Sequence, residues 1–157
     1  MMESSGDQHW LLPDGKLMAL DVGLSRIGVA VCDPLRLVAR PLAVIERQSR
    51  RDDFAKLAHL VDEEDVVAVV CGLPLSMDGT EADWTRTVRK WAKRLAYALR
   101  ALLGRPVSII FWDERLTTFA ANEILAELKA KDIAKDVAED AAAAAVILQY
   151  YLDALSR

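Results

Sequence analysis

The sequence predicts an α/β fold in which a mixed five-stranded sheet carries helices on both faces. Short apolar runs rich in Val, Ile and Leu come first in the chain and then alternate with segments of helical periodicity, in the order βββαβαβαα. The chain has 157 residues, of which 53% are hydrophobic, and this suits one core rather than two. We therefore expect a single domain over residues 16–157, preceded by a loosely held polar extension at residues 1–15.

The first three strands are predicted to form an antiparallel meander. Leu17–Val22 and Arg26–Asp33 are apolar runs separated by Gly23-Leu24-Ser25, which is typical of two strands joined by a tight turn. Ala39–Arg47 alternates less cleanly and is expected to pair beside them.

Helices and strands then alternate. A helix is expected from Arg50 to the acidic run Asp62–Asp65, because Phe54, Leu57 and Val61 follow a helical period. Thr80 resembles the N-cap of the second helix. The later elements are expected as follows: a strand at Val66–Cys71, a helix ending near Leu103 before Gly104 and Pro106, a strand at Val107–Trp112, a helix from Thr117 or Thr118 to Lys129, a charged loop at Lys131–Val137, and a last helix from Glu139 or Asp140 to Leu155.

The charge is weakly acidic overall but unevenly distributed. The net charge of −4 gives no general signal for nucleic-acid binding, yet the second helix is locally basic. Arg86, Lys90 and Lys93 on this helix are candidates for contact with substrate phosphates, and the alternative is a solvated charged face. Trp84 and Trp91, two turns apart, are expected to be core residues rather than base-stacking platforms.

Location and cysteine chemistry are also constrained. The N-terminal segment lacks the cationic start and apolar stretch of a signal peptide, and the longest apolar run is too short to span a membrane, so we expect a cytoplasmic protein without membrane contact. Cys32 and Cys71 lie inside apolar runs without metal-ligand spacing. Buried reduced thiols are expected there, not a zinc site.

Acidic side chains stand at the ends of several apolar elements. Asp21 lies inside the first strand, Asp113 and Glu114 end another, and Asp140 precedes an apolar helix face. Singly, Asp113 and Glu114 could be loop acids, and Asp140 could be an N-cap. If the sheet brings them to one edge, carboxylates without His or Cys favour Mg²⁺ or Mn²⁺ and suit two-metal hydrolysis of a phosphodiester.

The same residues carry a resemblance to the YqgF family, also called RuvX. Its blocks occur here in family order: Asp21-x-Gly23, Arg26-Ile27-Gly28-Val29-Ala30, Gly72-Leu73-Pro74, Asp78-Gly79-Thr80-Glu81, Asp113-Glu114-Arg115-Leu116-Thr117-Thr118, and Asp140 before Ile147-Leu148-x-x-Tyr151-Leu152. The resemblance implies a ribonuclease-H-like fold and a cytoplasmic nuclease that processes the 5′ end of pre-16S ribosomal RNA. Holliday-junction resolution is the older assignment of the family.

The resemblance also implies roles for individual residues. Asp21, Asp113, Glu114 and Asp140 match the family's catalytic acids. Side chains at neighbouring strand positions point to opposite sides, so only one of Asp113 and Glu114 can be a direct metal ligand. Glu114 has the longer reach, and we therefore expect Asp21, Glu114 and Asp140 to hold the metal, with Asp113 as the alternative to Glu114. Asp136 competes with Asp140 for the last role, but only Asp140 keeps the family's distance to Ile147-Leu148.

The first turn departs from the family pattern. The family usually has Thr-Lys where this chain has Leu24-Ser25, which removes a cation beside the expected metal site. Arg26 is the candidate replacement, and Arg115 of the fifth block is a further candidate for substrate contact. In the implied arrangement the first strand lies between those that carry Cys32 and Cys71, so we expect no disulfide between them.

Other functions are less compatible with the sequence. Sugar kinases and actin-like ATPases also begin with Asp-x-Gly in a first hairpin, but they need two such domains. A binding module that lost catalysis is the alternative of another class, favoured by Leu24-Ser25 and disfavoured by the acids. The sequence does not distinguish RNA from branched DNA as substrate, or a monomer from a homodimer.

Overall fold

The computed structural model describes residues 12–75, 78, 81–114, 126 and 135–156. Five strands form one sheet, at β1 (Lys16–Val22), β2 (Arg26–Cys32), β3 (Ala39–Glu46), β4 (Val66–Leu73) and β5 (Ser108–Asp113). Three helices are described, at α1 (Arg50–Glu63), α2 (Asp83–Leu103) and α4 (Lys135–Leu155). No helix among the described residues is long and apolar enough to cross a membrane.

The strand order is β3-β2-β1-β4-β5, so the first strand lies at the centre of the sheet. β1 pairs with β2 and β2 with β3 in antiparallel fashion, which confirms the predicted meander. β1 pairs with β4 and β4 with β5 in parallel, which requires the crossovers that the alternating helices supply. The sheet is mixed, as the sequence predicts.

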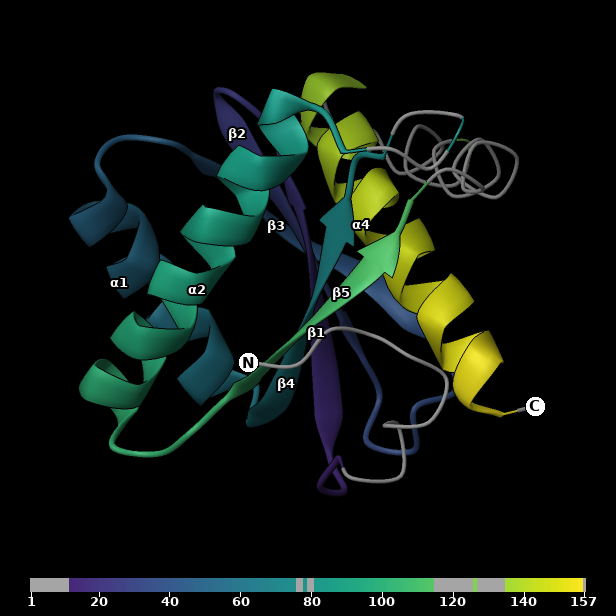
Figure 1. Ribbon diagram of the computed structural model, residues 1–157. Coiled ribbons are helices and arrows are strands. Elements are labelled where there is room, and N and C mark those ends of the chain that lie inside the picture. The colour runs from purple at the N-terminus through teal and green to yellow at the C-terminus, as the bar shows by residue number, and fades with distance from the viewer. Residues whose placement is uncertain (1–11, 76–77, 79–80, 115–125, 127–134, 157) are drawn as a thin grey trace.

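Helices cover both faces of the sheet, also as predicted (Figure 1). α1 and α2 lie on one face and α4 on the other. Alternation along β1 divides the core accordingly, because Met18, Leu20 and Val22 pack with the first pair of helices while Leu17 and Ala19 pack with α4. Leu12, just before β1, is also buried in the α4 layer.

Two helix starts differ from the expectation. The N-cap of α2 is Ala82, not Thr80, and it makes no side-chain cap. The entry of α2 is instead tied by a tertiary contact, in which the buried Thr85 hydroxyl donates to the Pro74 carbonyl at 2.7 Å. α4 begins at Lys135 rather than at Glu139 or Asp140.

The earlier start of α4 has a local cause. Its first turn, Lys-Asp-Val-Ala, contains no Gly or Pro, and an acid such as Asp136 is favourable at the N-terminus of a helix. The prediction relied on where the apolar face begins, which marks packing and not the first helical residue. Asp140 is therefore inside the helix and is not an N-cap.

Helix α2 ends as predicted, with Gly104 in the left-handed region at a φ of 71° and its N–H donating to the Arg100 carbonyl. The helix expected between Thr117 and Lys129 and the loop expected at Lys131–Val137 fall largely outside the described residues. Both cysteines are free and buried. Cys32 on β2 and Cys71 on β4 have β1 between them, which confirms that they form no disulfide.

Candidate active site

The site is built around Asp21, near the end of the central strand. Because Leu17 and Ala19 face α4, alternation places Asp21 on the same side of the sheet. Its cross-strand partner on β2 is Gly28. The central position of β1 thus brings the carboxylate beside α4 and next to β4.

Two glycines on the strands beside Asp21 allow other groups to approach the backbone of the sheet closely. A Cβ at Gly28 would overlap the backbone carbonyl of Asp140, so the absence of a side chain lets α4 lie against β2 there. A Cβ at Gly72 would lie 2.5 Å from the Oε2 atom of Glu114 and 2.6 Å from Ile147. The backbone of the sheet therefore leaves room for Asp140 and Glu114 on the α4 side.

Glu114 and Asp113 belong to different layers. On β5, Ile110 packs in the α4 layer and Phe111 in the layer of α1 and α2. Continued alternation directs Asp113 towards α1 and α2, and Glu114 towards α4. The N–H of Glu114 donates to the Leu73 carbonyl at 3.3 Å, so the pairing with β4 extends through this residue.

The acids of the site are like charges that are largely buried, which affects their pKa values. Burial raises the pKa of Asp21 from 3.8 to about 6, and the charge of Asp140 adds to the shift. Burial likewise raises the pKa of Glu114 from 4.5 to about 7, with further contributions from Asp21 and Asp113. Both carboxylates are therefore destabilised in their ionised form, which a cation would relieve.

Asp140 has a cationic neighbour. The Nε atom of Arg26 lies 2.6 Å from its Oδ2 atom, so Arg26 does place a positive charge beside the acids. The ion pair lacks hydrogen-bond geometry, and this buried Oδ2 accepts no hydrogen bond from the described part of the chain. The negative charge of Asp140 is therefore partly neutralised by Arg26.

The donor chemistry of this site fits a hard divalent cation, because carboxylate oxygens are the ligands that Mg²⁺ and Mn²⁺ prefer. The carboxylates are not gathered tightly, however. Over the described ranges, no group of three or more Asp, Glu, His or Cys side chains lies close enough together to hold a metal ion. Binding of an ion would therefore draw Asp21, Glu114 and Asp140 closer to one another.

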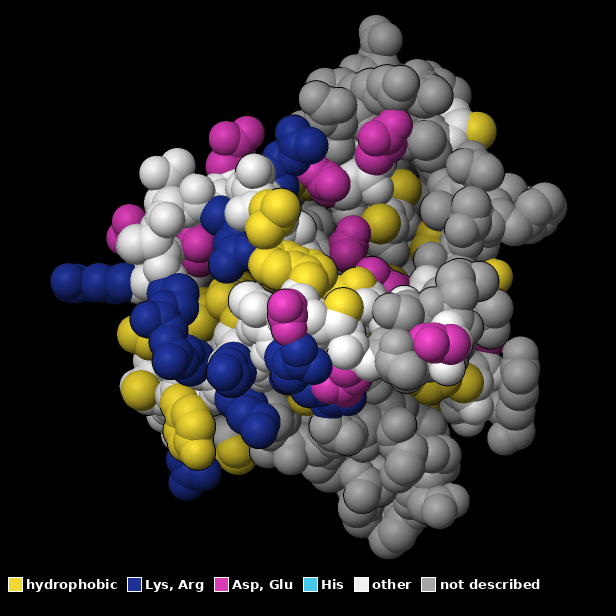
Figure 2. Space-filling model, turned by 45° about the horizontal axis from the view of Figure 1, so that its top comes forward, with side chains coloured by type: hydrophobic (Ala, Val, Ile, Leu, Met, Phe, Trp, Pro, Cys, Tyr) yellow, Lys and Arg dark blue, Asp and Glu magenta, His cyan; other side chains and the backbone are white. Residues whose placement is uncertain are grey.

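The other predicted contact residues lie on the opposite side of the sheet or cannot be placed. Arg86, Lys90 and Lys93 are exposed along α2, and Arg86 pairs with Asp83 one turn earlier. Figure 2 shows Lys and Arg side chains gathered on the left, where α1 and α2 lie, with acidic side chains nearer the middle of the same view. Arg115 lies outside the described residues.

The structure adds residues that the sequence analysis did not select. Arg47 follows β3 and donates from its guanidinium to the Gly23 carbonyl at 2.7 Å, which ties it to the turn after Asp21. Arg50 and Arg94 line a pocket with it. Their positive charge is visible in the sequence, but their proximity depends on how α1 packs against α2.

Comparison with known proteins identifies the family of the chain and agrees with this fold. A family model described as "RuvX: Holliday junction resolvase" matches residues 15–154. A protein of Syntrophus aciditrophicus named "Putative pre-16S rRNA nuclease" is 44% identical over 142 residues, covering 90% of this chain and 91% of that protein. A Myxococcus xanthus protein of the same name is 41% identical over 139 residues, covering 88% of each chain.

Among solved structures, the yeast mitochondrial Holliday junction resolvase Ydc2 superposes with a TM-score of 0.58. The superposition covers 92% of this chain and 80% of the resolvase, at 12% sequence identity. The fold is thus the ribonuclease-H-like fold of resolvases.

Proposed function

Because the chain belongs to the RuvX family of nucleases, we propose that it is a metal-dependent nuclease that processes the 5′ end of pre-16S ribosomal RNA in the cytoplasm. The observation that carries this proposal is the placement of Asp21, Glu114 and Asp140 on the α4 side of the central strands. The raised pKa values of Asp21 and Glu114 support it, because burial and, to a smaller extent, the charges of neighbouring acids disfavour their ionised forms, and a bound cation would offset both effects.

The residues of the chain have distinct roles in this proposal. Asp21, Glu114 and Asp140 would hold Mg²⁺ or Mn²⁺, and Arg26 orients Asp140 through their ion pair. A bound divalent ion would supply Lewis-acid activation of the attacking water and of the scissile phosphate. Asp113, in the other layer, contributes negative charge near Glu114 and is not a direct ligand.

Holliday-junction resolution is the second candidate, and the description of the family model favours it. A resolvase must cut two strands, so this function requires two active sites and hence a homodimer, whereas an RNA-processing enzyme can act as a monomer. A nucleic-acid-binding module without catalysis is the third. Cleavage of either nucleic acid by the purified protein would exclude this module, since only the first two candidates are enzymes.

The test is a parallel assay of purified protein on a precursor 16S rRNA fragment and on a four-way DNA junction, with Mg²⁺, Mn²⁺ or EDTA. We expect cleavage of the rRNA fragment that depends on divalent ions. Asp21→Asn should abolish it and retain substrate binding, while Asp62→Asn, a matched change at an exposed acid of α1, should not. Cleavage by Asp21→Asn, or cleavage in EDTA, would contradict the proposed mechanism, and preference for the junction would favour the second candidate.

A further inference from the structure

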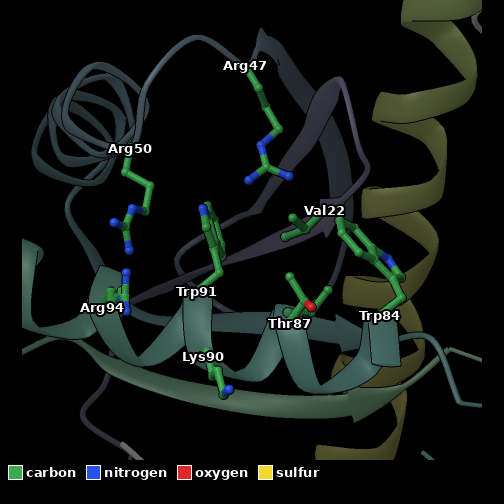
Figure 3. Close-up of a pocket in the computed structure, with 9 residues that line it drawn as sticks. Val22, Arg47, Arg50, Trp84, Thr87, Lys90, Trp91 and Arg94 are labelled. Carbon is green, nitrogen blue, oxygen red and sulfur yellow. The ribbon is translucent and has the colours of Figure 1, made fainter. Parts of the chain in front are cut away.

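A pocket of about 270 Å³ lies on the face of the sheet opposite to α4, between α1, α2 and the ends of β1 and β3 (Figure 3). We refer to it as the α1–α2 pocket. Cations line it from three segments, namely Arg47 after β3, Arg50 on α1, and Lys90 and Arg94 on α2. Trp84 and Trp91 supply its aromatic surface.

The charge of this pocket is not balanced. None of the described residues that line it is acidic. The side chains of Arg50, Lys90 and Arg94 make no ion pair or hydrogen bond with any described part of the chain. Figure 3 shows the side chains of Arg50 and Arg94 pointing towards one another, so two like charges face each other across the pocket. An anion between them would turn this repulsion into attraction.

A buried donor without an acceptor provides a second, independent observation. Trp91 is only 5% exposed, and its indole Nε1 atom is buried without a hydrogen-bond partner among the described residues. Burying such a donor without an acceptor destabilises the folded chain. In Figure 3 the nitrogen of this ring lies on the same side of the pocket as Arg47 and Arg50. The pocket therefore lacks an acceptor at the place where it concentrates positive charge.

Phosphate is the group that satisfies both requirements. Its oxygens accept hydrogen bonds from an indole N–H, and guanidinium groups bind them in bidentate fashion. A metal cation is disfavoured by the four positive charges. The volume is slightly smaller than the roughly 300–1,000 Å³ typical of pockets for drug-sized ligands. It therefore suits a phosphate with part of its nucleoside, whose planar base could lie on the half-buried Trp84.

The position of the pocket relates it to the acidic site. Val22, which lines the pocket, directly follows Asp21 on β1. Arg47 lies 5.9 Å from the centre of the Trp91 ring and donates to the Gly23 carbonyl. Arg47 thus contacts both the α1–α2 pocket and the turn that follows β1.

We propose that the α1–α2 pocket binds a phosphate group of a nucleotide, held by Arg50, Arg94 and the Nε1 atom of Trp91. This phosphate belongs either to a nucleotide of the substrate strand that flanks the cleaved bond, or to a free nucleotide. The assignment to a substrate strand rests on the proposed nuclease function. The existence of a phosphate site in this pocket does not depend on that function.

The test follows the indole N–H signal of Trp91 by two-dimensional ¹⁵N NMR of the full chain in EDTA. Trp91→Phe assigns the signal among those of the four tryptophans. Inorganic phosphate, a nucleoside monophosphate and a 5′-phosphorylated RNA of about ten nucleotides are titrated in turn. We expect at least one of these probes to shift the signal, and Arg50→Gln with Arg94→Gln to weaken that binding by about tenfold or more.

A matched double variant removes the same charge elsewhere. Lys56→Gln with Arg100→Gln takes one exposed cation from α1 and one from α2, outside the α1–α2 pocket, and should leave the affinity within about twofold. The pocket variant should also melt at the same temperature as the wild type or a higher one, because it removes the repulsion between Arg50 and Arg94. This measurement excludes misfolding as the cause of weak binding.

The outcomes distinguish the sources and the two proposals. A response to the monophosphate but not to the RNA assigns the site to a free nucleotide, and a response to the RNA assigns it to the strand. No shift with any of the three probes, or equal weakening by both double variants, would overturn the site. Because EDTA prevents cleavage, a chain that cannot hydrolyse any substrate would still give the expected shift.

Discussion

At the residue scale, Asp113 and Glu114 are neighbours in sequence but face opposite layers of the molecule. We predict that Glu114→Gln lowers the rate of metal-dependent cleavage by about 100-fold or more, because it removes a proposed metal ligand. Asp113→Asn should cost less than about tenfold, since it removes only a nearby charge. Single-turnover rates of the two variants at saturating Mg²⁺ provide the measurement. The reverse order would place Asp113 on the metal.

Gly28 illustrates a second effect of one residue. Gly28→Ala places a methyl group against the Asp140 carbonyl, and we predict a loss of about 1–3 kcal/mol in the free energy of unfolding, together with loss of cleavage. Gly104→Ala is the control, because its Cβ meets no atom within 4 Å but its φ of 71° strains an alanine by about 1–2 kcal/mol. Chemical denaturation and cleavage assays should therefore separate the two variants. Full cleavage activity of Gly28→Ala would show that α4 can shift away from β2 without loss of catalysis.

At the scale of the element, α2 presents its basic residues in different environments. Arg86 is paired with Asp83, Lys90 lines the α1–α2 pocket, and Lys93 lies with Arg100 along a second pocket. Replacing Arg86, Lys90 and Lys93 by Gln should weaken strand binding and reduce its salt dependence, by a slope of about 0.7 per lost phosphate contact. The single-turnover rate at saturation should not change.

Lys90 should account for most of this loss, since Arg86 already has a partner and Lys93 lies outside the α1–α2 pocket. We would measure the binding of a labelled RNA at several salt concentrations, for the triple variant and for Lys90→Gln alone. The comparison gives the share of the lost affinity that is due to Lys90. An unchanged affinity and salt slope in the triple variant would make α2 a solvated face and nothing more.

At the scale of the whole molecule, the acids couple stability to pH. The pKa values of Asp21 and Glu114 are raised to about 6 and about 7, so between pH 4 and 7 the folded chain holds protons that the unfolded chain has lost. Stability in EDTA should therefore fall as the pH rises through this range, by about 2–4 kcal/mol, and change little from this cause above it. Denaturant titrations from pH 4 to 8 measure the decrease.

Two further measurements identify the source of this decrease. Asp21→Asn should flatten the pH dependence and melt at a higher temperature than the wild type at pH 8 in EDTA, because one member of the repelling group is gone. Mg²⁺ or Mn²⁺ at pH 8 should stabilise the wild type more than this variant. A stability that rises between pH 4 and 7 in both proteins would show that other groups dominate.

The sequence by itself determined the order and type of the described elements, though not the first residues of α2 and α4, and it supplied the candidate acids of the site. Local periodicity and Gly-Pro breaks marked the strands and α2. The acids at the ends of apolar runs marked Asp21, Asp113, Glu114 and Asp140 as candidates. Both signals depend on residues only a few positions apart. Tertiary structure decided which strand is central, how close Gly28 allows Asp140 to approach, and that Arg47, Arg50 and Arg94 share one pocket with Trp91. Those features depend on packing between segments distant in the chain, and no local pattern encodes which side chains then meet.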